Sequence, residues 1–194
     1  SRVAADREIK VLIMTGSGKA FCAGGDITTW GSMMTASAGR DRMKTGPQNI
    51  IRSMMDLEKP IIAAVNGAAM GAGFNIALAA DFIIAADNAR FQQSFAKMGL
   101  VPDMGGFYNL PLRVGVARAK EIMITARPIE AREADRLGLV ERVVPAEQLM
   151  QEVSDLAATF VTGPTRTYAM IKAALNLWPM NVRAYMEMEA NMQA

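Results

Sequence analysis

The stretch "KPIIAAVNGAAMGAGFNIALAADFIIAADNARF", residues 59–91, decides how the chain folds. Its first part, "PIIAAV", predicts a buried strand; the residues from about Gly71 to Ala80 predict a helix, and "DFIIAA" (81–86) predicts a second strand. The apolar part is also long enough for a membrane span, which needs roughly 20 residues. Glycine and polar residues recur in it at turn-like intervals, so a strand, a turn, a helix and a strand are favoured over a membrane helix.

Segments on both sides extend this α/β pattern. "IKVLIMTGS" (9–17) predicts another buried strand, residues 48–57 predict a helix, and "ARFQQSF" predicts a short strand. From Val114 onward the periodicity is mostly helical, interrupted by one short strand, "LVERVV". The order of elements is therefore α/β first and helical later.

Three regions follow from this order. We expect an α/β core over residues 1–144 and a helical region, suited to oligomerisation, over residues 145–194. The polar residues 35–47 form the one stretch that resembles a linker. Because the sequence starts almost directly at a core strand and stops inside a helical pattern, we also expect that segments at both ends are absent.

The 194 residues include no histidine, which excludes Ser-His-Asp and Cys-His catalysis and histidine-ligated zinc. Proton transfer near neutral pH must then use a carboxylate, a lysine, a tyrosine or the one thiol, Cys22. A single cysteine forms no intrachain disulfide, so we expect a reducing, cytoplasmic compartment. The net charge is only +2, from 21 basic and 19 acidic residues without a basic run, so nucleic acid is not an expected partner.

The glycine-rich stretches fail the nucleotide-binding patterns. Gly18-Lys19 is not followed by Ser or Thr, and "GAGFNI" has Ile76 where the dinucleotide pattern needs its third glycine. Two loops of small residues remain, "CAGGD" (22–26) and "GAAMGAG" (67–73), each after an apolar strand. Two such loops can hold an oxyanion between two backbone amides, although spacing alone favours ordinary tight turns in a packed core.

Five segments together resemble the crotonase superfamily, the enoyl-CoA hydratase/isomerase family. They are "GKAFCAGGDI", the stretch 59–91 quoted above, "KMGLVPDMGG", "LPLRVGVARAKEIMIT" and "EAREADRLGLVERVV". The segments occur in family order at family-like separations, and they cover nearly the whole chain. "FAKMGLVPDMGG" particularly resembles the epoxyphenylacetyl-CoA isomerase group of the phenylacetate pathway.

The resemblance implies an α/β fold, a crotonase-like spiral of ββα units with a helical C-terminal region, and an acyl-CoA thioester as substrate. By position, it implies an oxyanion hole made by the backbone amides of Gly25 and Ala72. The other residues that it places around the substrate are Ala23, Gly24, Asp26, Ile27, Gly71, Asn75, Ser94, Phe95 and Met98. It implies a homotrimer or hexamer, no metal, no membrane partner and no separate cofactor, since coenzyme A is part of the substrate.

The sequence departs from the family pattern at the acid–base positions. Typical hydratases carry two glutamates across the substrate double bond, and Asn75 and Phe95 occupy those positions here. Neither side chain can act as a general acid or base. Asp103 lies in the "VPDMGG" loop, where typical hydratases have glycine and some isomerases and dehalogenases place their working carboxylate. We therefore predict that Asp103 is the acid–base group and that apolar neighbours raise its pKa.

One carboxylate suffices to move the double bond of an enoyl-CoA from the β,γ to the α,β position, because it can remove a proton from C2 and return one at C4. Double-bond isomerisation is therefore the leading prediction. Three alternatives stay open: a hydratase with atypical acid–base residues, a non-catalytic acyl-CoA-binding homologue, and ring expansion or dehalogenation with Asp103 as a nucleophile. Spacing alone favours Asp103 as the cap of a helix that begins at Met104–Gly105, and only the resemblance favours the catalytic role.

Overall fold

The computed structural model describes residues 2–26, 36–177 and 181–193, so the candidate residue Ile27 lies outside the described part of the chain. The strands in this part form two four-stranded sheets. The first sheet is parallel throughout, in the order β1 (Leu12–Thr15), β3 (Ile61–Val65), β5 (Phe82–Ala86) and β8 (Arg142–Val144). The second has the order β2 (Ala20–Cys22), β4 (Ala68–Met70), β6 (Arg90–Gln92) and β7 (Ile129–Glu130), and its last pair is antiparallel.

The first six strands alternate between the two sheets. β1 and β2, β3 and β4, and β5 and β6 each place their first strand in the first sheet and their second strand in the second sheet. Helices follow each pair before the chain returns to the first sheet, which is the ββα repeat that the resemblance implies. The predicted α/β fold is thereby confirmed.

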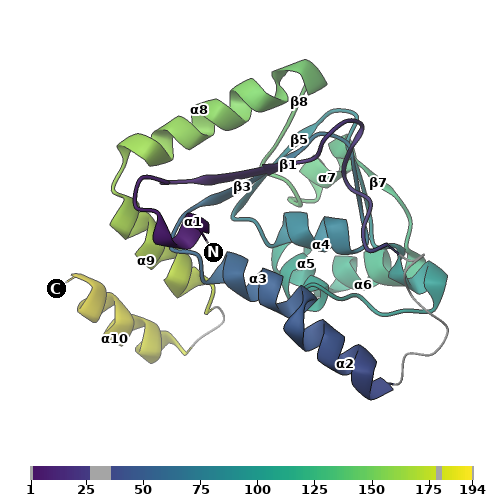
Figure 1. The fold of residues 1–194 in the computed structure, drawn as a ribbon, viewed down its shortest axis with the longest axis horizontal. Helices are drawn as coiled ribbons and strands as arrows, with labels where there is room; N and C mark the ends of the chain where they lie inside the picture. Colours follow the sequence, from purple (N-terminus) through teal and green to yellow (C-terminus); the bar gives the residue numbers. More distant parts are fainter. Residues whose placement is uncertain (1, 27–35, 178–180, 194) are drawn as a thin grey trace.

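Helices connect and cover the sheets (Figure 1). The α-helices are α1 (Arg2–Ala5), α2 (Ala36–Thr45), α3 (Pro47–Met55), α4 (Ala72–Leu78), α5 (Gly106–Val114), α6 (Val116–Thr125), α7 (Ala131–Arg136), α8 (Leu149–Thr162), α9 (Thr165–Leu175) and α10 (Val182–Gln193). Two short 3₁₀ helices are η2 (Ser94–Met98) and η3 (Ala146–Gln148).

The central strands of the first sheet, β3 and β5, are buried on both faces, as is usual for parallel strands. Figure 1 shows α8 on one side of β1, β3 and β5, and α4 on the other. Ile61 and Ile83 pack on the α4 side with Phe74, whereas Ile62 and Ile84 pack on the α8 side. This two-residue alternation explains why β3 and β5 read as continuous apolar runs. It also fixes α4, and with it the residues at both ends of that helix.

Several sequence-based boundaries differ from the observed ones. The polar stretch 35–47, predicted to be linker-like, contains α2, so that prediction is wrong for residues 36–45. The strands β2, β4 and β7 were not predicted, because runs of two or three residues carry no readable period. Of the predicted strand "IKVLIMTGS", only β1 is a strand. Of the predicted strand "ARFQQSF", only β6 is a strand, and the last residues of this stretch belong to η2.

No helix among residues 2–26, 36–177 and 181–193 has the length and apolar character that crossing a membrane demands. The apolar stretch 59–91 is divided into β3, β4, α4 and β5 instead.

Replacing Ile84 with alanine tests whether α8 packs against β3 and β5 of the first sheet. Ile84 is fully buried, so we expect Ile84→Ala to lower the free energy of unfolding by about 2–5 kcal/mol, from lost burial and the remaining cavity. Ile124→Ala is the matched control, because Ile124 is 73% exposed and its loss should change stability by less than about 0.5 kcal/mol. Equal effects in urea denaturation would contradict this packing.

Candidate functional site

The two glycine-rich loops meet because the strands that precede them are neighbours. β2 pairs with β4 in parallel, so the chain leaves both strands at the same edge of the second sheet. Gly24 has a φ of 101°, and a Cβ there would lie 2.9 Å from the Met70 carbonyl oxygen and 3.7 Å from the Ala72 nitrogen. A Cβ on Gly73 would clash with the Cys22 carbonyl. Only glycine permits this approach of the two backbones.

A cavity of about 820 Å³ opens beside these loops. Its lining is mainly apolar and comes from four parts of the chain: the loop after β2, the α2–α3 region, the start of α4, and the segment from η2 to α5. The lining residues are Cys22, Gly24, Gly25, Asp26, Met43, Pro47, Gln48, Ile50, Ala72, Ile76, Phe95, Leu100, Val101, Pro102, Asp103, Met104, Gly105, Gly106, Phe107 and Tyr108. Both candidate oxyanion residues, Gly25 and Ala72, are among them.

Ala72 is the first residue of α4, so its N–H belongs to the first turn, whose amides have no acceptor within the helix. Gly25 is exposed in the loop after β2. Gly25 and Ala72, from separate segments of the chain, thus line one cavity.

Asp103 brings a carboxyl group to the same cavity. Its Oδ1 atom is buried and has no hydrogen-bond partner in the described part of the chain. Desolvation raises the pKa of the Asp103 carboxyl above its usual range, against a smaller opposing effect of a backbone hydrogen bond. The helix-cap alternative is wrong, because α5 begins at Gly106, its N-cap is Gly105, and no side chain caps it.

The two positions where the family places glutamate differ in their surroundings. Phe95 is buried and lines the cavity. Asn75 is completely buried behind the lining, where its Nδ2 donates a hydrogen bond to the Asp103 carbonyl oxygen (2.8 Å). Its Oδ1 accepts a hydrogen bond from Gln93 Nε2 (2.6 Å). Asn75 is thus engaged with the Asp103 loop rather than with the cavity space.

Not every residue predicted to bind substrate lines the cavity. Gly24 and Asp26 do, whereas Ala23 and Met98 are exposed outside the lining. Gly71 and Ser94 lie behind it: a Cβ on Gly71 would meet Ser94 Oγ at 3.1 Å.

The wall that α2 and α3 supply was missed in the sequence. Met43, Pro47, Gln48 and Ile50 all line the cavity. Met43 falls in the stretch interpreted as a linker, and no sequence signal places it near Asp103. The apolar periodicity of residues 48–57 predicts the α3 helix but not the surface that it faces.

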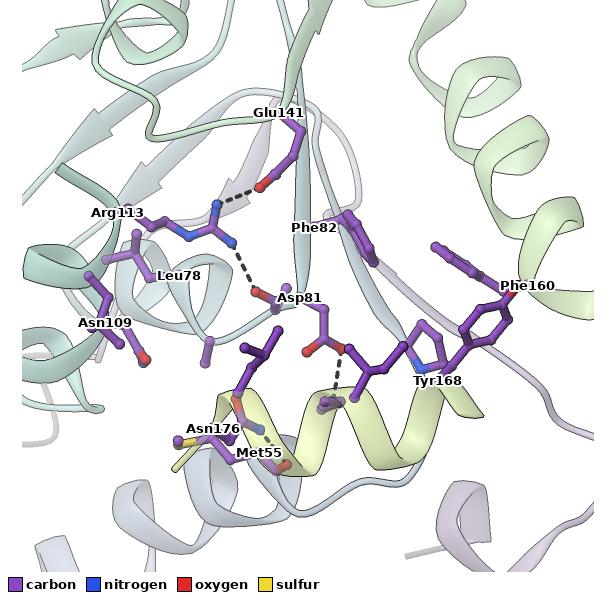
Figure 2. A pocket seen from close by; sticks show the side chains of 17 residues that line it. Met55, Leu78, Asp81, Phe82, Asn109, Arg113, Glu141, Phe160, Tyr168 and Asn176 are labelled. Carbon is purple, nitrogen blue, oxygen red and sulfur yellow. Dashed lines mark hydrogen bonds and ion pairs between the residues drawn. The ribbon is translucent and has the colours of Figure 1, made fainter. Parts of the chain in front are cut away.

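A second cavity, of about 550 Å³, lies between α9 and the region of α3, α5 and β5, and its charged groups are already paired (Figure 2). Lys172 Nζ lies 2.8 Å from Asp81 Oδ2, which also accepts the Ile61 amide hydrogen bond (2.7 Å). Arg113 bonds to Glu141 (2.8 Å) and to the Ala80 carbonyl oxygen (3.0 Å). These contacts tie α9 and α5 to the sheet, so we assign this cavity's charged groups to structure.

Comparison with known proteins identifies relatives of the chain. The model of the family described as "Enoyl-CoA hydratase/isomerase" matches residues 1–194. The chain is 37% identical over 188 residues to a "probable enoyl-CoA hydratase" of Rhodobacter capsulatus, covering 96% of this chain and 72% of that protein. It is 41% identical over 172 residues to a "crotonyl-CoA hydratase" of Syntrophomonas wolfei, covering 88% of this chain and 65% of that protein.

A crystal structure of an enoyl-CoA hydratase/isomerase from Cupriavidus metallidurans superposes with a TM-score of 0.93 at 38% identity, covering 99% of this chain and 72% of that one. The chain spans about two thirds of the length of the curated relatives that it matches.

The buried pair between Asp81 and Lys172 predicts an asymmetric response to mutation. Burial raises the pKa of Asp81, and the Lys172 charge opposes that effect. Lys172→Met should therefore lower stability by about 3 kcal/mol or more at pH 7, because it leaves an uncompensated carboxylate. The loss should shrink as the pH falls and Asp81 becomes protonated. Arg90→Met, which breaks the exposed pair with Glu130, should cost less than about 1 kcal/mol.

Removing the Asp103 carboxylate should raise stability rather than lower it. A folded-state pKa above the unfolded value means that ionised Asp103 lowers stability, and the cost grows as the pH rises through the folded pKa. Asp103→Asn should thus raise the denaturation midpoint at pH 7 and leave it unchanged near pH 3. Asp87→Asn, at an exposed turn, serves as control. A lower midpoint for Asp103→Asn at pH 7 would show that the carboxylate is stabilised in the fold.

Proposed function

This chain belongs to the enoyl-CoA hydratase/isomerase family of the crotonase superfamily, and we propose that it shifts the double bond of an enoyl-CoA thioester, with Asp103 as the acid–base group. The observation that carries the proposal is the desolvated Asp103 carboxyl in the cavity that Gly25 and Ala72 border. The thioester portion would lie against those two amides. The apolar lining suits an acyl group that is largely hydrocarbon.

The carboxylates of the cavity support a single carboxylate base. The lining also contains the thiol of Cys22 and the hydroxyl of Tyr108, which donates to the Asn176 carbonyl oxygen (3.1 Å). Among the described lining residues, the carboxylates are Asp26, which is exposed, and Asp103, which is half-buried. Phe95 cannot ionise, and the Asn75 side chain bonds to the Asp103 carbonyl and to Gln93. Chemistry that needs one carboxylate therefore fits better than chemistry that needs two.

The proposed reaction balances with Asp103 alone. The Asp103 carboxylate removes a proton from C2 of a 3-enoyl thioester, and the electron pair moves onto the thioester oxygen as an enolate. The amides of Gly25 and Ala72 stabilise the negative charge by hydrogen bonding. The enolate re-forms the carbonyl, the double bond moves to C2–C3, and the Asp103 carboxyl returns the proton at C4. The enzyme ends in its starting protonation state.

The raised pKa of Asp103 suits this role. A carboxylate in water is a weak base, and a higher pKa brings its proton affinity closer to what the transfer demands near neutral pH. The acid limb of the pH profile of kcat/KM would then report the Asp103 pKa, so activity should fall as the pH drops through a value above the ordinary one.

Water addition is the second candidate, favoured by the names of the relatives, which include a crotonyl-CoA hydratase. Hydration needs a group that activates water and a group that protonates the α-carbon, tasks usually shared between two side chains. Here Asp103 would have to serve both steps in turn. A non-catalytic acyl-CoA binder is distinguished from both enzymes, because it would bind the thioester without exchanging its α-protons with deuterated water.

The test is Asp103→Asn, assayed with matched 2- and 3-enoyl-CoA substrates while double-bond position, water addition and deuterium uptake are followed together. We expect the wild-type protein to isomerise the 3-enoyl-CoA and the variant to lose about 10²–10⁴-fold in kcat, the usual contribution of an acid–base group. Asp87→Asn should retain wild-type activity, since Asp87 is exposed and does not line the cavity. Isomerisation by Asp103→Asn at the wild-type rate would refute the proposal, and water addition without isomerisation would select the hydratase.

A further inference from the structure

Asn75 joins the Asp103 loop to two other parts of the chain. Its side chain is fully buried, and its amide uses both ends: Nδ2 donates to the Asp103 carbonyl oxygen (2.8 Å), and Oδ1 accepts from Gln93 Nε2 (2.6 Å). Gln93 is itself fully buried just after β6. The Asp103 carbonyl oxygen can only accept, so it determines that the NH₂ end of the Asn75 amide faces the Asp103 loop, and Oδ1 then accepts from Gln93.

The Asp103 carbonyl accepts a second hydrogen bond, from the Gly106 amide (2.9 Å). Both donors fix the peptide plane that follows Asp103, and thereby limit the directions open to its side chain. A Cβ on Gly106 would lie 2.6–2.8 Å from atoms of the Asn75 amide group. The absence of a side chain at this position therefore lets the loop lie directly on Asn75.

The loop that these bonds hold has an unfavourable backbone conformation. Met104 has a φ of 46°, which is rare for a residue other than glycine, and the next residue, Gly105, has a φ of 73°. A strained backbone persists only where its surroundings over-determine it. The Met104 side chain is buried, and the neighbouring Asp103 carbonyl has two donors, so packing and hydrogen bonding both maintain this conformation.

Asn75 is also rigidly connected to Ala72. Both residues belong to α4, three positions apart. The backbone N–H of Asn75 donates to the Gly71 carbonyl oxygen (3.1 Å) in the first turn of that helix. One short helix thus carries a candidate oxyanion donor at its start and a hydrogen-bond donor to the Asp103 loop one turn later. The position of the base relative to the oxyanion site depends on that turn.

We propose that Asn75 is a positioning residue: together with Gln93, it holds the Asp103 loop so that the carboxyl group stays in the cavity at a fixed place relative to the Ala72 amide. The inference rests on the proposed function, since positioning matters for a group that transfers protons. Asn75 itself neither touches substrate nor exchanges protons.

Loss of this contact should release the carboxyl rather than unfold the site. In Asn75→Ala the Asp103 carbonyl keeps only the Gly106 donor, and the loop can relax so that water reaches the carboxyl. A solvated carboxyl returns towards its ordinary pKa, near 3.9. A displaced base reacts more slowly even when substrate still binds, so kcat should fall about 10²-fold while KM changes by less than about threefold.

The experiment compares the full chain as wild type, Asn75→Ala, Gln93→Met and Asn109→Ala, each labelled with carboxyl-¹³C aspartate. NMR titration then gives the Asp103 pKa directly, with Asp103→Asn to assign its signal. We expect a clear fall of the Asp103 pKa in Asn75→Ala and a smaller fall in Gln93→Met, which keeps the volume but removes the donor to Asn75 Oδ1.

Asn109→Ala is the matched control. Asn109 is another buried asparagine, on the adjacent helix α5, but its Nδ2 has no hydrogen-bond partner in the part of the chain that the structure describes. The Asn109 side chain lies beside Gly105 in the same loop but makes no hydrogen bond to the Asp103 carbonyl, so its removal should shift the Asp103 pKa much less than Asn75→Ala does. Thermal melts of all four proteins distinguish displacement of the carboxyl from general loss of structure.

An unchanged Asp103 pKa in folded Asn75→Ala overturns the inference, as does an equal shift in Asn109→Ala. If Asn75→Ala does not fold, Gln93→Met decides by the same measure. An unchanged kcat in a variant with a shifted pKa also overturns it. The titration needs no turnover, so it tests the positioning role independently of the proposed function. Failure of the proposed function would appear as a wild-type protein that does not isomerise any 3-enoyl-CoA.

Discussion

The contact between the loop after β2 and the start of α4 is the constraint on which the candidate site depends. Gly24 lies against Met70 and Ala72, and Gly73 lies against Cys22, at distances that admit no side chain on either glycine. The parallel pairing of β2 with β4 brings these segments together, and burial of β3 and β5 on both faces fixes α4 in turn. The sheets thus determine the positions of the two candidate amides. The close approach of the two backbones explains why small residues are concentrated in the loop after β2 and at the start of α4.

The same packing makes the surroundings of Asp103 energetically unfavourable. A carboxyl group placed among apolar residues is costly to ionise, and one of its oxygens has no partner in the described chain to offset that cost. The adjacent Met104 adds backbone strain at a φ of 46°. Unfavourable features that gather at one loop, while the β3 and β5 core around them is regular and fully buried, are typical of a site where activity rather than stability has set the residues.

Sequence reasoning predicted the elements that carry the candidate residues better than it predicted the walls of the cavity. The absence of histidine and the family resemblance together directed attention to Asp103, and the apolar runs predicted β3, α4 and β5 nearly to the residue. Helix α2 was missed because its sequence, "ASAGRDRMKT", has no apolar period, and the cavity wall at Met43 was missed with it. The bond between Asn75 and Asp103 joins positions 28 residues apart, and such a distance is a product of packing that no local pattern encodes.

The departures from the family pattern are connected through this bond. A glutamate on α4 would sit on a helix, whose backbone hydrogen bonds fix its direction, whereas Asp103 sits on a loop that has no such support of its own. Asparagine at position 75 offers a donor and an acceptor without a charge, so it can hold that loop from the helix without competing with Asp103 for a proton. A carboxylate at position 75 would instead face the Asp103 carbonyl oxygen and raise the cost of ionising Asp103. A neutral hydrogen-bonding residue at position 75 therefore suits an acid–base group at position 103, the role that we propose for Asp103.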